Sequence, residues 1–242
     1  MDSGNGLSTI SERTNNCIIA SSPSRASGSD RRQLVYDILI RPYLERDIPE
    51  ERQVMSFSLA FSHVGIYVTN IDRMADFYTR VLRFVVSDRG KTTQGGGDIV
   101  FMTRDPAEHH QFVMATGRPA DLQYNIVNQL SFRVDSLQTL RELHEELKNE
   151  PHVKLLGPVT HGNALSVYFL DPEGNRVEFL IDTPWHVPQP FRIPVDLSLP
   201  DKELWATIEK NVRATPGFKP MAEWKVEIRK KIDQASRHTA KA

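Results

Sequence analysis

Hydrophobic and polar positions follow a recurring order between about residues 58 and 183. A run rich in β-branched and aromatic residues at 61–68 predicts a strand, and residues 71–82 place apolar side chains at helical spacing. Three further strand-like runs complete this first unit, at 84–87, 98–103 and 109–115. The first half of the region is therefore predicted to be a strand, a helix and three strands.

The same order of elements recurs in the second half of the region. Residues 128–134 predict a strand, and residues 137–147 carry leucines at helical spacing. Three strands follow, at 154–156, 164–170 and 176–181. Such self-similarity indicates an internal duplication, here of a βαβββ unit. We therefore predict an α+β fold of two tandem modules, about 58–117 and 127–183, whose paired curved sheets form a cleft.

The segments on either side of this domain differ from it in composition. Residues 1–31 are rich in Ser, Asn, Gly and Arg and are predicted to be disordered, because so few apolar side chains cannot offset the entropy of ordering. Residues 32–57 are predicted to form a short helical lead-in. Residues 184–242 begin Pro-rich and then show helical patterns at 201–213 and 221–235, which predict a helical C-terminal extension packed on the core.

Composition and charge narrow the class of protein. Hydrophobic residues make up 39% of the 242 residues, which is enough for a globular core. The formal net charge of -1 gives no electrostatic reason to expect nucleic acid or an anionic membrane as a partner. The one cysteine, Cys17, excludes an intramolecular disulfide, and no apolar run approaches the roughly 20 residues that cross a bilayer. We therefore expect a cytoplasmic protein with neither kind of partner.

Two residues and one turn carry a resemblance to a known family. His63 stands near the start of the first module's first strand, and Glu178 stands in the last strand of the second module, behind Asp-Pro-Glu-Gly-Asn-Arg at 171–176. This pattern resembles the signature of the vicinal oxygen chelate (glyoxalase/bleomycin resistance/dioxygenase) superfamily. With Thr-His-Gly-Asn at 160–163 and Tyr168, it specifically resembles the type I extradiol catechol dioxygenases.

The resemblance implies a mononuclear metal site between the modules. Its ligands would be His63, Gln129 and Glu178, with Fe(II) as the expected metal and Mn(II), Zn(II) or Ni(II) as alternatives. The family has a second histidine where this sequence has Gln129, whose neutral amide is a weaker donor, although a similar glutamine is a metal ligand in some glyoxalase I enzymes. Independently, Glu178 lies in an apolar strand, and a buried carboxylate without a partner is costly, so a metal or other cation is expected there.

The resemblance also implies residues that move protons during ring cleavage. His110 would take a substrate hydroxyl proton or steady the iron-bound superoxide, His161 would act as acid or base, and Tyr168 would hydrogen-bond a substrate oxygen. The implied activity is that of an extradiol-type ring-cleaving dioxygenase with a small catechol-like or polyhydroxylated aromatic compound and O2 as substrates. Relatives with this fold commonly form dimers or larger assemblies, so the resemblance allows a homodimer. The same residues also have ordinary structural explanations, as a strand-surface histidine, a loop histidine and a core tyrosine.

Two other functions stay open on the same residues. A glyoxalase-like lyase or isomerase would use Zn, Ni or Mn as a Lewis acid without oxygen, and Gln129 favours it. Glyoxalase I enzymes, however, carry a further acidic ligand on the last strand of the first module, where residues 109–114 contain neither Asp nor Glu. The third candidate is a metal-free protein of this fold that binds a small aromatic ligand. Substrate choice is expected to depend on the loops at 92–97 and 184–196.

Overall fold

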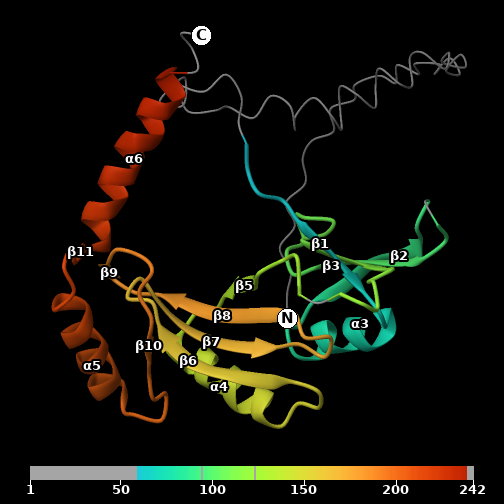
Figure 1. Cartoon of the computed structure of the whole chain (residues 1–242), viewed down its shortest axis with the longest axis horizontal. Helices are drawn as coiled ribbons and strands as arrows, with labels where there is room; N and C mark the ends of the chain where they lie inside the picture. The colour runs from blue at the N-terminus through green and yellow to red at the C-terminus, as the bar shows by residue number, and fades with distance from the viewer. Residues whose placement is uncertain (1–58, 94, 123, 239–242) are drawn as a thin grey trace, which may run out of the picture. The chain divides into compact units, whose positions relative to one another are not determined.

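Two βαβββ modules follow one another along the chain (Figure 1). The computed structural model describes residues 59–93, 95–122 and 124–238. The predicted disordered segment, 1–31, and the predicted helical lead-in, 32–57, lie outside these residues. The order of strands and helices confirms the predicted α+β class with two tandem modules.

The first module forms a four-stranded sheet with the order β1–β4–β3–β2. Its elements are β1 (Val64–Val68), α3 (Ile71–Arg80), β2 (Val85–Lys91), β3 (Asp98–Thr103) and β4 (Phe112–Thr116). β1 and β4 are parallel, whereas the other pairs are antiparallel. Asn70 caps α3 by accepting a hydrogen bond from the backbone N–H of Arg73. Met74 and Phe77 are buried on one side of α3, which packs against β3 and β4.

The second module repeats this arrangement. Its elements are β5 (Leu130–Arg133), α4 (Leu137–Lys148), β6 (Lys154–Thr160), β7 (Ala164–Leu170) and β8 (Arg176–Asp182). β5 lies parallel to β8, as β1 lies parallel to β4 in the first module. A fifth strand, β10 (Ile193–Pro194), comes from the C-terminal extension and pairs with β6. Ser136 caps α4, whose buried Leu140 and Leu147 contribute to the core.

The predicted position of two histidines is wrong. The strand predicted at 109–115 begins only at Phe112, because a turn in which the Asp105 carbonyl accepts a backbone hydrogen bond precedes it. His109 and His110 therefore lie in the loop before β4 and not on a strand.

One predicted strand is longer in the structure. The strand predicted at 154–156 continues to Thr160 as β6. The register with β7 shifts between Leu155 and Gly157, so Leu156 is the extra residue of a β-bulge, and Gly157, with a φ of 91°, stays paired with β7. The longer strand leads directly into the turn that carries His161.

The C-terminal extension is helical, as predicted. Its elements are β9 (Trp185–His186), β10, α5 (Asp201–Arg213), β11 (Lys219–Pro220) and α6 (Met221–His238). Leu204, Ile208 and Val212 recur every four residues along α5 and are buried in the same core cluster as residues of both modules. The described helices include none with the length and apolar character needed to span a membrane.

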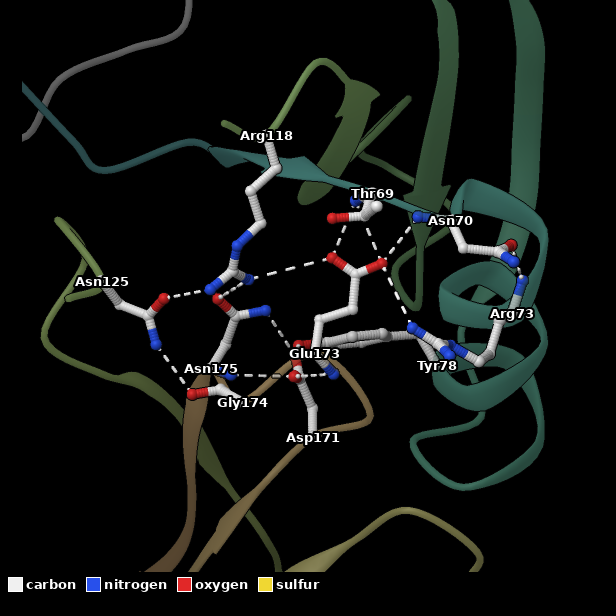
Figure 2. Close-up of polar contacts among 10 residues, drawn as sticks. All are labelled: Thr69, Asn70, Arg73, Tyr78, Arg118, Asn125, Asp171, Glu173, Gly174 and Asn175. Atoms are coloured by element: carbon white, nitrogen blue, oxygen red, sulfur yellow. Dashed lines mark hydrogen bonds and ion pairs between the residues drawn. The ribbon is translucent and has the colours of Figure 1, made fainter. Parts of the chain in front are cut away.

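A buried glutamate joins the two modules (Figure 2). Glu173 lies in the turn between β7 and β8, and its side chain is only 3% exposed. Its carboxylate accepts hydrogen bonds from the backbone N–H groups of Thr69, at 2.8 Å, and Asn70, at 2.6 Å. Asn70 is the N-cap of α3 and Thr69 precedes it, at the end of the helix that has unsatisfied N–H groups and a partial positive charge. The turn of the second module therefore supplies an acceptor to the helix of the first.

Arg118 and Asp171 extend this contact (Figure 2). The guanidinium of Arg118 lies 3.8 Å from the Glu173 carboxylate and donates to the side-chain oxygen of Asn175, at 3.1 Å. Asp171 accepts a hydrogen bond from the hydroxyl of buried Tyr78 on α3, at 3.1 Å. Burial, followed by the charge of Asp171, raises the pKa of Tyr78, so the hydroxyl keeps the proton that it donates. We call these contacts with α3 the Glu173 junction.

We expect Glu173→Gln to lower the free energy of unfolding by about 2–4 kcal/mol, because it removes a buried charge and turns an amide donor toward backbone N–H groups. The matched control is Glu146→Gln, which breaks an exposed 3.2 Å ion pair with Arg83 between the same two modules. That change should cost under about 1 kcal/mol. Urea denaturation measures both variants, and equal losses would contradict the importance of the Glu173 junction.

Candidate functional site

Glu178 lies in a row of polar side chains across the second sheet. Tyr168 on β7 and Ser131 on β5 are its direct neighbours in the strand register, and such neighbours share one face of a sheet. Glu178 is buried, at 4% exposure. Its Oε2 accepts hydrogen bonds from Nε2 of Gln129, at 3.0 Å, and from the Ser131 hydroxyl. The structure thus places Gln129 and Glu178, two of the predicted metal ligands, in direct contact.

Two neutral neighbours donate hydrogen bonds to one oxygen of the Glu178 carboxylate. The sequence predicts that this carboxylate needs a metal or another cation, but the structure brings two neutral donors, Gln129 and Ser131, within hydrogen-bonding distance. The donor types also fit a divalent metal, since carboxylate and amide oxygens are common ligands of such cations. Glu178 is therefore placed to act either as a metal ligand or as a hydrogen-bond acceptor.

A hydrogen-bonded histidine and tyrosine lie beside Glu178. His161 lies in the turn between β6 and β7, and its Nδ1 is 2.8 Å from the carbonyl oxygen of Phe191. Because a carbonyl oxygen only accepts, Nδ1 carries the proton, and Nε2 of the neutral ring accepts. Nε2 lies 3.0 Å from the hydroxyl of Tyr168, whose one hydrogen has two acceptors beside it, this nitrogen and the carboxylate of Glu178. Phe191 thus fixes the tautomer in which His161 is a base toward Tyr168.

The C-terminal extension holds the turn that carries His161. Gly162 has a φ of 75°, and a Cβ at this position would overlap the side chain of Val187, so only glycine fits. The side-chain amide of Gln189 donates to the His161 carbonyl, at 2.7 Å. β10 pairs with β6 immediately before the turn. The extension therefore forms part of the site's structure, although it lies outside the duplicated modules.

The surroundings of Tyr168 keep its hydroxyl protonated. Burial raises the pKa of Tyr168, and the neighbouring Glu178 carboxylate raises it further. Gln129 and the positive charge of Arg192 act in the opposite direction but do not outweigh these effects. The guanidinium carbon of Arg192 lies 6.0 Å from the centre of the Tyr168 ring. The hydroxyl is therefore a hydrogen-bond donor at neutral pH.

The first module contributes a separate group of histidines. The ring centres of His63 and His110 are 4.4 Å apart, and Nδ1 of His109 lies 2.9 Å from Nδ1 of His110. Desolvation, followed by the two neighbouring histidines, lowers the pKa of His110 and favours its neutral form. In the described part of the chain, no three His, Cys, Asp or Glu side chains form a group that could hold a metal ion. The contacts thus divide the predicted site residues between the modules.

Two cavities adjoin these groups. The smaller has a volume of about 450 Å³ and is lined by Gln129, Leu156, His161, Tyr168, Arg176 and Arg192. The larger has a volume of about 1040 Å³ and takes residues from both modules, including Ser62 and Val64 beside His63. Gln129 lines both cavities. It therefore connects the part of the site near His63 with the part around Tyr168.

Sequence reasoning misses Ser131 and Phe191. Ser131 lies two positions after Gln129, so alternation along a strand is the pattern that would have placed the two side chains together. Phe191 acts through its backbone carbonyl, which no side-chain pattern reveals. The loop at 184–196 is predicted to affect substrate choice, and Arg192 from this loop lines the smaller cavity.

Several known proteins resemble about half of this chain. Biphenyl-2,3-diol 1,2-dioxygenase 2 of Rhodococcus globerulus is 32% identical over 136 residues, which cover 53% of this chain and 65% of that enzyme. A glyoxylase/bleomycin resistance protein/dioxygenase domain from Frankia sp. EAN1pec is 22% identical, covers 53% of this chain and 100% of its own, and has a TM-score of 0.45. The fosfomycin resistance protein FosX of Listeria monocytogenes, solved with Mn(II) and sulfate, is 17% identical over 52% of this chain and 95% of its own, with a TM-score of 0.42.

The family model of the Glyoxalase/Bleomycin resistance protein/Dioxygenase superfamily matches residues 60–179. This span begins before β1 and ends within β8, so it covers the first module and all of the second except the last residues of β8. It also contains every predicted site residue, from His63 to Glu178. The chain therefore belongs to this superfamily through residues 60–179.

Proposed function

We propose that the chain is an extradiol-type ring-cleaving dioxygenase that acts on a catechol-like aromatic diol. The observation that carries this proposal is the hydrogen-bonded pair of His161 and Tyr168 beside the carboxylate of Glu178. A site that only bound an aromatic ring would need no base and hydroxyl at this place. The 32% identity to a biphenyl-diol dioxygenase supports the same class of reaction.

A divalent metal held by His63, Gln129 and Glu178 is part of this proposal. Gln129 and Glu178 are in contact, and Ser62 and Val64, on either side of His63, line the same cavity as Gln129. When bound, the metal would supply a Lewis-acidic and redox-active centre for the diol and dioxygen. Fe(II) is the metal that we propose, with Mn(II), Zn(II) and Ni(II) as the alternatives.

The protein's own residues would move the substrate protons. When Tyr168 donates its hydrogen to Nε2 of His161, its oxygen keeps lone pairs that accept a hydrogen bond from a substrate hydroxyl. A proton that passes from the diol through Tyr168 would reach Nε2 of His161, and the Phe191 carbonyl would stabilise the resulting imidazolium from the Nδ1 side. His110 contacts His63 instead, so its proposed role lies beside the ligand of the first module.

A metal-free binding protein is the second candidate. Its support is the Glu178 carboxylate, whose Oε2 accepts hydrogen bonds from the neutral side chains of Gln129 and Ser131. Such a protein would bind an aromatic ligand equally well with and without added metal. A lyase or isomerase would instead turn over a hemithioacetal without consuming oxygen.

We expect protein loaded anaerobically with Fe(II) to take up oxygen with a catechol and to release a ring-opened product. Glu178→Ala should abolish this activity, and Glu178→Gln, which keeps the side-chain shape, should do the same. The matched control is Asp182→Ala at the exposed end of the same strand, which should remain active. Oxygen-electrode measurements across a broad catechol panel provide the test. No uptake by the wild type with any member would refute the proposed function.

Tyr168→Phe should lower kcat by about 10²-fold or more while changing KM little, because it removes the proton route but keeps the ring. Tyr124→Phe is the control, since this tyrosine is 75% exposed and lines neither cavity. Steady-state kinetics with the best catechol separate the two constants. If both variants have the same kcat, the His161–Tyr168 pair takes no part in the reaction.

A further inference from the structure

Two arginines line the smaller cavity beside the His161–Tyr168 pair. Arg176 begins β8 and lies two residues before Glu178, so both side chains leave the same face of the strand. Arg192 comes from the loop between β9 and β10, and its guanidinium faces the Tyr168 ring at 6.0 Å. The residues that line the cavity include these two guanidinium groups and no carboxylate. Two positive charges therefore line the cavity, and the Glu178 carboxylate lies behind Gln129 and Tyr168 in the same wall.

Neither arginine has a partner of opposite charge among the residues that the structure describes. Other arginines in this part of the chain do form ion pairs, such as Arg80 with Glu150 at 2.6 Å. Arg176 and Arg192, in contrast, form no ion pair and donate no side-chain hydrogen bond to any described residue. Two like charges in one cavity repel each other, and a bound anion would attract both of them and offset this repulsion.

We infer that Arg176 and Arg192 form an anion subsite, and that the compound bound in this cavity carries a carboxylate on its aromatic ring. The planar guanidinium group matches a carboxylate in geometry and can donate two parallel hydrogen bonds to it. The ring hydroxyls would then lie toward Tyr168 and His161. The inference that the ring carries hydroxyls rests on the proposed function, whereas the inference of an anion subsite follows from the cavity itself.

The size and exposure of the site set the expected strength of this recognition. A volume of about 450 Å³ is in the range of small-molecule sites. Arg176 and Arg192 are both solvent-exposed, so water and salt weaken their attraction for an anion. A gain of about tenfold in affinity is therefore expected from the carboxylate, and not the larger gain of a fully buried ion pair.

Binding to the full-length chain tests the subsite without turnover. Anaerobic isothermal titration calorimetry compares benzoate with benzyl alcohol, and 3,4-dihydroxybenzoate with catechol. We expect each carboxylate to bind about tenfold more tightly than its neutral counterpart. Arg192→Gln and Arg176→Gln should each remove most of this difference. Arg229→Gln removes the same charge from an exposed position on α6, outside the cavity, and should leave the difference unchanged.

Three outcomes would overturn the inference. Equal affinity for the charged and neutral ligands would refute the anion subsite, and so would an equal loss in Arg229→Gln. Inorganic phosphate that competes as well as benzoate would refute the choice of a carboxylate. Protein that binds carboxylates through Arg192 but never consumes oxygen would keep the subsite and refute the proposed function. Protein that cleaves catechol without preferring carboxylates would support the proposed function and refute the anion subsite.

Discussion

The hydrogen bonds from the beginning of α3 to the buried carboxylate of Glu173 are the contact on which the two-module arrangement depends. The first N–H groups of a helix need an acceptor, and here the other module provides it. The same turn presents Asp171 to the Tyr78 hydroxyl and then enters β8, the strand that carries Glu178. The contact that joins the modules is therefore built into the strand that forms the centre of the candidate site.

The candidate site combines parts of the chain with different origins. The duplicated modules provide Gln129 and Glu178, together with the hydroxyl of Tyr168. The C-terminal extension provides the Phe191 carbonyl, which determines where the proton of His161 resides. The superfamily match ends at residue 179, so this contact lies outside the segment shared with the family. The proposed chemistry and the proposed ligand preference thus depend on a part of the chain that the family pattern does not describe.

Much of the fold follows from local patterns, whereas much of the site does not. Helical spacing and strand alternation predict the duplicated modules, α5 and α6, because burial imposes these periods on neighbouring residues. The same logic places Glu178 in the last strand. Strand propensity fails at His110, where a turn takes priority over the apolar residues that follow. The sequence also does not predict the Glu173 junction, because a carboxylate in a turn sequence gives no indication of the helix that it will contact.

The central claim is that one metal site is shared by the two modules, with His63 on one side and Glu178 on the other. Metal analysis of protein loaded and purified anaerobically tests it most directly, with His63→Ala compared against His144→Ala, a change on α4 that lies outside both cavities. The account predicts a near-stoichiometric divalent metal in the wild type and in the control, and its loss in His63→Ala. Metal retained by His63→Ala, or none bound by the wild type, would contradict a site shared between the modules.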